Sequence, residues 1–275
     1  MAAPTHAPDL DAIAANVLSA LASHRQIPAF SHSPGGLTLG DAYRLPPLLR
    51  AAFEARGKKI TGRKIGFTNR QMWTAYGVAA PIWGYCTDRT TRDLRTTPVQ
   101  SVAAFAEPRI EPEIMFGLGK APDPNLDDSA LLDCIDWVAL GYEIVQSIFP
   151  GWKFAAFDTI AANALHGMLL IGSPHPISPD RESWQHDLAS FTVELCCNGK
   201  LSQTGAGAFV LGSPLLALRH LVELLAADRH NPPLRAGEII STGTLTLAMP
   251  VHAGETWTTR VHGLPLEDIT VRLEA

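Results

Sequence analysis

Short apolar segments separated by glycine and proline dominate the chain from about residue 60 to its end. Runs of this length, rich in β-branched and aromatic residues and bounded by turn residues, are typical of β-strands. Asn198 and Gly199 follow one such run and predict a tight hairpin. We expect strands over 64–68, 82–86, 110–118, 137–145, 168–172, 191–197, 238–249, 257–263 and 269–275.

Helices are expected mainly in the N-terminal part of the chain. Residues 8–24 carry apolar side chains at helical spacing. Thr38 and Asp41 resemble a capping box that begins a second helix, which the prolines at 46–47 should break or restart. Further along, Ser213 and Pro214 predict the start of a long helix, and 131–137 is a candidate for another.

The arrangement of these segments predicts an α+β protein. A small helical part over 1–75 is joined to a β-rich body over 76–275. No segment between them has the composition of a linker, so we expect one continuous folding unit.

Composition excludes several classes of function. The chain has 275 residues and a net charge of −5, with 46% hydrophobic and 18% charged residues, which is ordinary for a soluble protein. Lys and Arg are scattered, so we expect no nucleic-acid binding. The chain has no apolar run long enough for a membrane helix and no signal-peptide pattern. We therefore expect a cytoplasmic protein without a membrane role.

The segment over 110–116 carries the most informative motif. Glu111 and Glu113 lie two residues apart on a predicted strand and should project from the same face. Glu143 lies in a second apolar strand. Three oxygen ligands suit Mg²⁺ or Mn²⁺. In the alternative interpretation, Glu111 and Glu113 pair with basic side chains on an edge strand. Pro112 between them predicts a sheet edge or a bulge.

Lys64 lies in a half-apolar strand between glycines. Burial would lower the pKa of its amine and suit it to proton transfer, and Asp88 is a candidate to orient it. The alternatives are a surface lysine and a turn residue. Further along, 241–244 ends a strand with Ser-Thr-Gly-Thr, whose hydroxyl and N–H groups could hold a carboxylate.

The motifs in order resemble one known family. They are GRKIGFT, PIWGY with TD, E-P-E, YEIV, FDTIAANA, NGK with TGAGAFVLGSPLLAL, and GEIISTGTLT. Together they are similar to the 2-oxopent-4-enoate hydratase and 4-oxalocrotonate decarboxylase family of the fumarylacetoacetate hydrolase superfamily. The resemblance runs from about residue 37 to the C-terminus.

The resemblance implies a fold, a metal and a site. The fold is a mixed β-roll with an N-terminal α/β part. Glu111, Glu113 and Glu143 match the metal ligands, Lys64 the acid–base lysine and Asp88 its partner. The substrate contacts would be Thr68, Gly243 and Thr244. Such enzymes take small 2-oxo acids and generally form homo-oligomers, with a pathway partner as an open possibility.

The sequence also departs from the family pattern. Gln146-Ser147 stands where many relatives have Asp-Ser, and Ala162 to His166 replaces a segment that often contains a serine pair. His166 is therefore a candidate acid–base or binding residue. The alternative is a structural histidine whose hydrogen bonds are satisfied.

Four functions compete. The first is a metal-dependent hydratase that adds water to a 2-hydroxy-2,4-dienoate and gives a 4-hydroxy-2-oxo acid. The second is a decarboxylase of a 2-oxo-3-enedioate, with Arg70, Arg89 or His166 holding the second carboxylate. The third is an acylpyruvate C–C hydrolase, for which His32 is the one candidate histidine near the N-terminus. The fourth is an inactive subunit that supports a partner. We expect the first.

Overall fold

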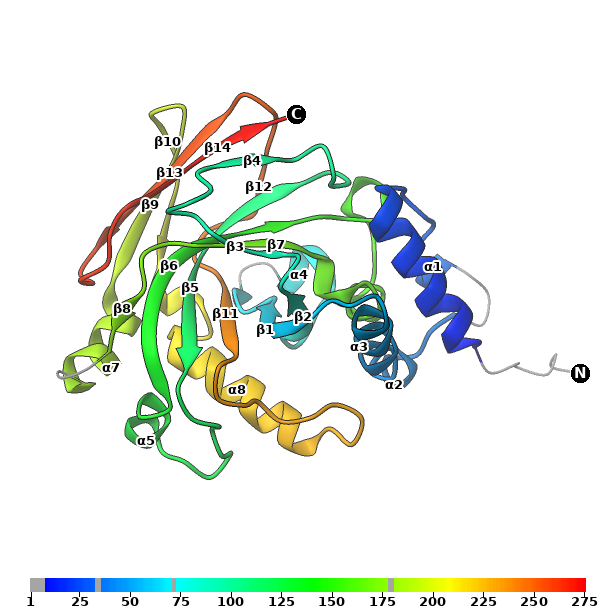
Figure 1. Ribbon diagram of the computed structural model, residues 1–275, viewed down its shortest axis with the longest axis horizontal. Helices are drawn as coiled ribbons and strands as arrows, with labels where there is room; N and C mark the ends of the chain where they lie inside the picture. The colour runs from blue at the N-terminus through cyan, green and yellow to red at the C-terminus, as the bar shows by residue number, and fades with distance from the viewer. Residues whose placement is uncertain (1–7, 33–35, 71–72, 178–180) are drawn as a thin grey trace, which may run out of the picture.

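Two sheets form the centre of the molecule, and helices lie at one end and along one side of it (Figure 1). The computed structural model describes residues 8–32, 36–70, 73–177 and 181–275. The strands are β1 (Ile60–Gly66), β2 (Ile82–Thr87), β3 (Thr91–Asp93), β4 (Val99–Ser101), β5 (Arg109–Leu118), β6 (Ile135–Val145), β7 (His166–Ile171), β8 (His175–Pro176), β9 (Thr192–Cys197), β10 (Lys200–Ala206), β11 (Ile239–Thr244), β12 (Met249–Pro250), β13 (Thr256–His262) and β14 (Ile269–Glu274).

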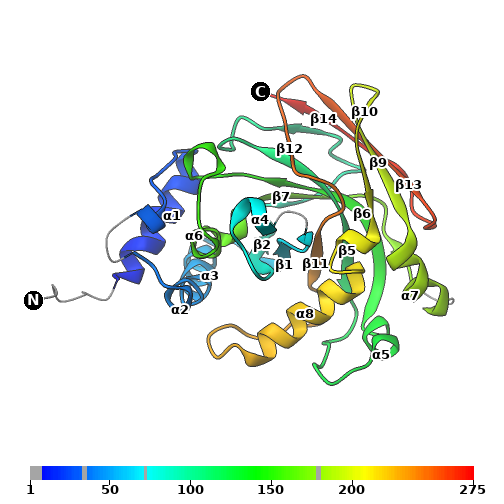
Figure 2. The same ribbon diagram turned by 180° about the vertical axis from the view of Figure 1, so that it is seen from behind.

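The helices lie around the sheets (Figures 1 and 2). The α-helices are α1 (Leu10–Ser23), α2 (Leu39–Ala42), α3 (Leu45–Ala55), α4 (Trp73–Tyr76), α5 (Asp128–Leu132), α6 (Ala156–Ala161), α7 (Arg181–Ser190) and α8 (Pro214–Ala227). The 3₁₀ turns are η1 (Phe30–His32), η3 (Pro150–Trp152), η4 (Asn163–Leu165) and η5 (Gly207–Phe209). No helix of the described chain has both the length and the apolar character needed to cross a lipid bilayer.

The larger sheet has the main strand order β2-β1-β11-β5-β6-β7-β3. The pairing of β1 with β11 is parallel, whereas β5 pairs antiparallel with both β11 and β6. The smaller sheet has the order β10-β9-β13-β14-β4. The Tyr142 hydroxyl of β6 donates a hydrogen bond to the carbonyl of Ile269 on β14 at 3.1 Å and so ties the two sheets together. The mixed-sheet α+β fold expected from the sequence is confirmed.

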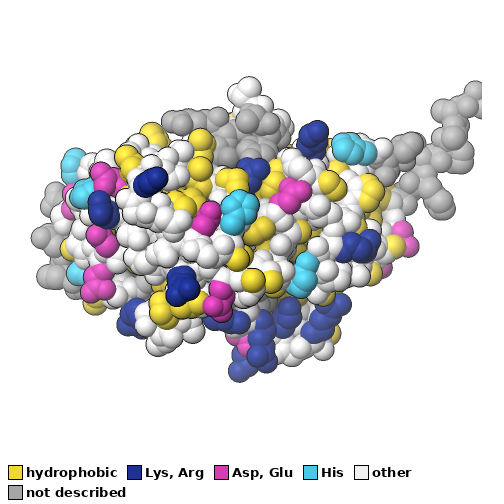
Figure 3. Space-filling model, turned by 90° about the horizontal axis from the view of Figure 1, so that it is seen from above, with side chains coloured by type: hydrophobic (Ala, Val, Ile, Leu, Met, Phe, Trp, Pro, Cys, Tyr) yellow, Lys and Arg dark blue, Asp and Glu magenta, His cyan; other side chains and the backbone are white. Residues whose placement is uncertain are grey.

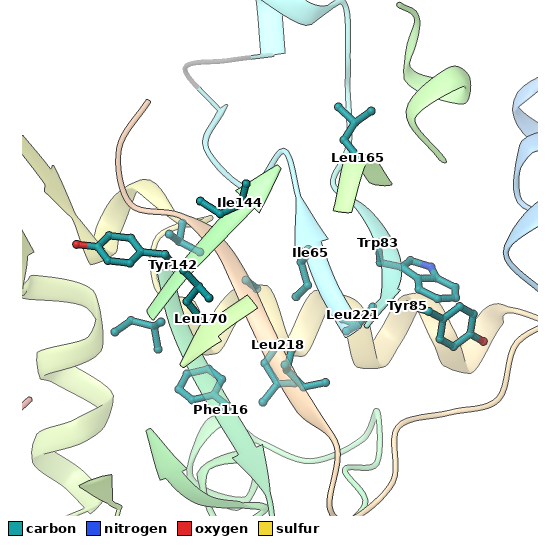
Figure 4. Packing of buried hydrophobic residues seen from close by; sticks show 14 of the residues in the cluster. Ile65, Trp83, Tyr85, Phe116, Tyr142, Ile144, Leu165, Leu170, Leu218 and Leu221 are labelled. Atoms are coloured by element: carbon teal, nitrogen blue, oxygen red, sulfur yellow. The ribbon is translucent and has the colours of Figure 1, made fainter. Parts of the chain in front are cut away.

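One large hydrophobic core joins the sheet to α8. Ile65 of β1 and Phe116 of β5 lie in this core with Leu218 and Leu221 of α8 (Figure 4). The side chain of Ser213 caps this helix by accepting a hydrogen bond from the Leu215 amide at 3.2 Å. On the face shown in Figure 3, hydrophobic side chains lie in small patches between polar and charged ones, and Lys and Arg gather at one edge.

Most of the expected elements are present. The Thr38–Asp41 capping box begins α2, and the prolines at 46–47 lie in the first turn of a separate helix, α3. Asn198 and Gly199 form the turn between β9 and β10, with positive φ angles of 50° and 78°. The expected strand over 238–249 is divided between β11 and β12.

The expected helix over 131–137 is wrong. Asp127 caps α5 earlier, by accepting a hydrogen bond from the Ala130 amide at 2.8 Å, and α5 ends at Leu132. The chain then enters β6 at Ile135, which pairs with Leu118 of β5.

Pro112 lies in the interior of the larger sheet, between β6 and β11. Tyr142 of β6 opposes it. On its other side the register of β11 shifts between Ser241 and Thr244. Pro112 has no N–H to donate. It is tolerated here because the irregular register of β11 interrupts the hydrogen-bond ladder between β11 and β5, so no donor is needed at this position.

Two leucines of α8 offer a test of this packing. Leu218 is 0% exposed and Leu216 is 38% exposed. We expect Leu218→Ala to lower the free energy of unfolding by about 2–5 kcal/mol, because it leaves a cavity under the sheet. The matched variant Leu216→Ala should change it little. Denaturant unfolding followed by fluorescence measures both, and equal effects would contradict the placement of α8.

Candidate metal centre and active site

Pairing of β5 with β6 gathers three carboxylates. Glu111 stands directly opposite Glu143 in the register, and Glu113 follows two residues later on the same face of β5. One oxygen from each of the three lies within 4.8 Å of the others. Glu113 and Glu143 are buried and Glu111 is half-buried. The E-x-E motif is therefore on a central strand, not on the edge strand of the alternative interpretation.

The carboxylates destabilise one another's charged forms. Burial and the nearby charge of Glu143 raise the pKa of Glu111 to about 7, although Lys64 and Arg109 act in the opposite direction. Burial, then Glu143 and Glu111, raise the pKa of Glu113 well above its ordinary value. Glu113 Oε1 has no hydrogen-bond partner among the described residues. An orphaned buried oxygen beside two further carboxylates is the donor set that a hard divalent cation requires, so these residues fit such an ion.

Lys64 is buried against this cluster. Its Nζ lies 3.1 Å from Glu143 Oε2 and donates a hydrogen bond to the carbonyl of Ala164 at 2.9 Å. Burial lowers the pKa of Lys64, but the charges of Glu143, Glu111 and Glu113 outweigh it, so that the pKa is raised. The expected lowered pKa is wrong for this arrangement, and so is the alternative of a surface lysine.

The end of β11 over 241–244 holds the carboxylate of Glu113, a residue of the protein itself. The Ser241 hydroxyl and the Gly243 amide, the latter at 2.9 Å, both donate to Glu113 Oε2. Gly243 has a φ of +99°, and a Cβ there would lie 1.8 Å from Thr68 Oγ1. Only glycine fits, because both the backbone conformation and the contact exclude a side chain. Thr68 Oγ1 is buried without a hydrogen-bond partner among the described residues.

His166 contacts the cluster from β7. Its Nδ1 lies 2.7 Å from Glu143 Oε1 and its Nε2 lies 2.9 Å from Thr90 Oγ1. Both ring nitrogens are thus engaged, which holds Glu143 in position. This arrangement matches the alternative interpretation, a histidine whose hydrogen bonds are satisfied. No motif marked Thr90, which lies in the turn between β2 and β3.

Asp88 does not contact Lys64. Its Oδ1 accepts a hydrogen bond from the Lys59 amide at 3.0 Å. In the pairing of β1 with β2, Lys64 stands opposite Gly84, several residues from the end where Asp88 lies. The expectation that Asp88 orients Lys64 is therefore wrong in geometry: Glu143 takes that place, and Asp88 is a turn residue.

A pocket opens beside the cluster and is mostly apolar. Lys64, Glu111, Asn69 and Thr244 contribute polar groups to it. The apolar lining comes from Ile65, Phe67, Ile82, Val145, Trp152, Ala164, Leu165 and Ala248. Trp152 was not foreseen from the sequence; the Arg109 guanidinium lies 4.1 Å from the centre of its ring. His32 is exposed on η1, and the described lining contains no histidine.

Known proteins are similar to this chain in sequence. The fumarylacetoacetate (FAA) hydrolase C-terminal family model matches residues 75–272. A 2-hydroxyhexa-2,4-dienoate hydratase from Comamonas testosteroni is 30% identical over 89% of this chain and 90% of its own length. A 4-oxalocrotonate decarboxylase from Pseudomonas sp. (strain CF600) is 31% identical over 92% of this chain and 93% of its own length.

Solved structures agree with these matches. The 4-oxalocrotonate decarboxylase from Pseudomonas putida G7, complexed with magnesium and adipate, has a TM-score of 0.86 and 29% identity, covering 96% of this chain and 97% of that one. The same enzyme has also been solved with calcium and acetate. The chain therefore belongs to the fumarylacetoacetate hydrolase family, in the group that includes the 2-keto-4-pentenoate hydratases and the 4-oxalocrotonate decarboxylases.

Proposed function

We propose that the chain is a divalent-metal-dependent lyase that adds water to a 2-hydroxy-2,4-dienoate and gives a 4-hydroxy-2-oxo acid. The observation that carries the proposal is the cluster of Glu111, Glu113 and Glu143 beside the buried Lys64 at an apolar pocket. The three carboxylates would hold Mg²⁺ or Mn²⁺. When bound, the cation supplies a Lewis acid that withdraws electron density from the 2-oxo acid group.

Lys64 is the group placed to move protons. Its ammonium lies at the pocket and is held by Glu143 and the carbonyl of Ala164. In the first step, the proton of the 2-hydroxyl moves to a diene carbon and leaves a double bond conjugated with the 2-oxo group. In the second, the oxygen of water bonds to C4 and its proton goes to C3. We assign both transfers to Lys64 as general acid–base.

Neighbouring residues hold the carboxylates of Glu143 and Glu113 in position. His166 and Lys64 fix Glu143, while Ser241 and Gly243 fix Glu113. Thr68 offers a free hydroxyl and Thr244 lines the pocket, so both are candidates to contact the substrate near Gly243. A rigid arrangement of this kind reduces reorganisation during the reaction.

Decarboxylation of a 2-oxo-3-enedioate is the second candidate, supported by the similarity to 4-oxalocrotonate decarboxylases. Such a substrate carries a second carboxylate. Among the described lining residues the sole cation is Lys64, which already pairs with Glu143. Arg70, Arg89 and His166, the earlier candidates for this contact, lie outside that lining. The apolar pocket therefore favours the hydratase.

Substrate choice tests the proposal directly. We expect the protein with Mg²⁺ to convert 2-hydroxypenta-2,4-dienoate to its 4-hydroxy-2-oxo acid, and a chelator to abolish the conversion. An NMR time course with a 2-oxo-3-enedioate in parallel measures both reactions. Faster chelator-sensitive release of CO₂ from the dicarboxylate would contradict the hydratase and favour the second candidate.

The carboxylate cluster predicts stabilisation by metal. Mg²⁺ relieves the repulsion among the three carboxylates, and a concentration ~100-fold above its Kd adds about 2.7 kcal/mol to the free energy of unfolding. We expect thermal unfolding to shift upward with Mg²⁺ in the wild type and to shift little in Glu111→Gln. The exposed Glu223 of α8 gives the matched control Glu223→Gln, which should behave as the wild type. A full shift in Glu111→Gln would place the metal elsewhere.

Lys64 is tested by removing its charge. Lys64→Met should lower kcat by about 10²–10⁴-fold, because proton transfer is lost. The metal-dependent rise in the unfolding temperature should persist, which shows that the variant is folded. Lys59→Met changes an exposed lysine just before β1 and is the control. An unchanged kcat in Lys64→Met would remove Lys64 from the chemistry.

A further inference from the structure

A second cavity lies next to the pocket of the carboxylate cluster. It has a volume of about 330 Å³ and is bounded by the ends of α1 and α3, by β2 with the turn that follows it, and by β7. Thr90 and His166 line it, so it reaches the histidine that holds Glu143. The two cavities have no lining residue in common.

The lining of this second cavity is basic. Arg56, Lys58 and Arg89 contribute to it, and the lining includes no aspartate or glutamate among the described residues. No ion pair joins these three cations to a described residue. The ammonium of Lys58 lies 5.2 Å from the centre of the Phe53 ring. Three cations that face one hollow attract an anion, and guanidinium groups match the geometry of a carboxylate.

Apolar side chains complete the lining. Leu18 and Leu21 of α1, Phe53 of α3, and Phe105 and Met168 face the same space. A bare inorganic anion would leave these surfaces in contact with water. An anion attached to an apolar body would cover them and gain the free energy of burial.

Four residues over 163–166 form a wall between the two cavities. Ala164 and Leu165 line the pocket of the carboxylate cluster, whereas Asn163 and His166 line the basic cavity. Asn163, Ala164 and Leu165 have positive φ angles of 53°, 53° and 62°. Three consecutive non-glycine residues in this conformation store about 1–3 kcal/mol each, and the surrounding contacts must hold them there.

Contacts on both sides hold the wall. The Asn163 side chain accepts a hydrogen bond from the Tyr85 amide at 2.8 Å and donates one to the Tyr85 carbonyl at 2.9 Å. On the other side Lys64 donates to the carbonyl of Ala164. A ligand that shifts the wall from the basic cavity would thus also move groups that hold Lys64 and Glu143.

We propose that the basic cavity binds a small carboxylate with an apolar body, and that its occupancy changes the metal affinity of the Glu111, Glu113 and Glu143 cluster through residues 163–166. The binding part of this proposal rests on the basic cavity alone. The communication rests on the proposed function, because it needs the metal site. By linkage, metal and carboxylate then alter each other's affinity by the same factor.

Benzoate is the probe for binding, with neutral benzamide as the control ligand. Binding is measured by calorimetry in the presence of a chelator. The chelator keeps the carboxylate cluster free of metal, so that its negative charge repels benzoate. We expect saturable binding of benzoate that is about 10-fold or more weaker in the double variant Arg56→Gln/Arg89→Gln, because charge-assisted hydrogen bonds are lost. Lys200→Gln, an exposed lysine at the β9–β10 hairpin, should bind as the wild type does.

Three results would overturn the binding site: no saturable binding, equal affinity in the double variant, or tighter binding of benzamide than of benzoate. Glu111→Gln separates this proposal from the metal site. It should retain benzoate binding, and loss of binding there would place the anion at the carboxylate cluster instead.

Communication is measured by titrating Mg²⁺ with and without saturating benzoate. We expect the apparent Kd for Mg²⁺ to change by at least about 5-fold in the wild type and to stay constant in Arg56→Gln/Arg89→Gln. An unchanged Kd in the wild type would overturn the communication. Failure of Mg²⁺ to bind at all would instead count against the proposed function, since benzoate binding is measured without metal.

Discussion

Repulsion among three clustered carboxylates, two of them buried and one half-buried, is the constraint on which the site depends. Glu111, Glu113 and Glu143 face one another because β5 and β6 pair in a fixed register, and a shift of one residue would turn the pair on β5 to the opposite face. Lys64 offsets part of the negative charge, and a divalent cation fits the remainder. Without a metal, burial and the excess of negative charge raise the pKa values of Glu111 and Glu113.

Neighbouring strands of one sheet supply this site in order. Lys64 lies on β1, Ser241 on β11, Glu113 on β5, Glu143 on β6 and His166 on β7, and these strands are adjacent in the order β1-β11-β5-β6-β7. Side chains from adjacent strands that share a face meet at spacings of a few ångströms. The core beneath, with α8 packed on β11, fixes the strands and therefore the distances between the charged groups.

Local sequence patterns predicted much of this structure. The two-residue spacing of Glu111 and Glu113, the capping signals and the hairpin at Asn198 act over a few residues, and the structure contains them. The partners of Lys64 could not be read in the same way: Ala164 is 100 residues away along the chain, and the packing of η4 against β1 and β2 brings the two together. Asp88 failed as a partner for the same reason, and the pKa of Lys64 depends on three distant carboxylates. The basic cavity draws on helices and strands from separate parts of the chain, so no single motif marks it.

The proposed chemistry requires that the three carboxylates hold one divalent cation. Manganese replaces magnesium at oxygen ligands and scatters X-rays anomalously, so crystals soaked in Mn²⁺ report its position without ambiguity. We expect a single strong anomalous peak between the side chains of Glu111, Glu113 and Glu143, beside the ammonium of Lys64. A peak elsewhere, with this cluster empty at saturating Mn²⁺, would contradict it.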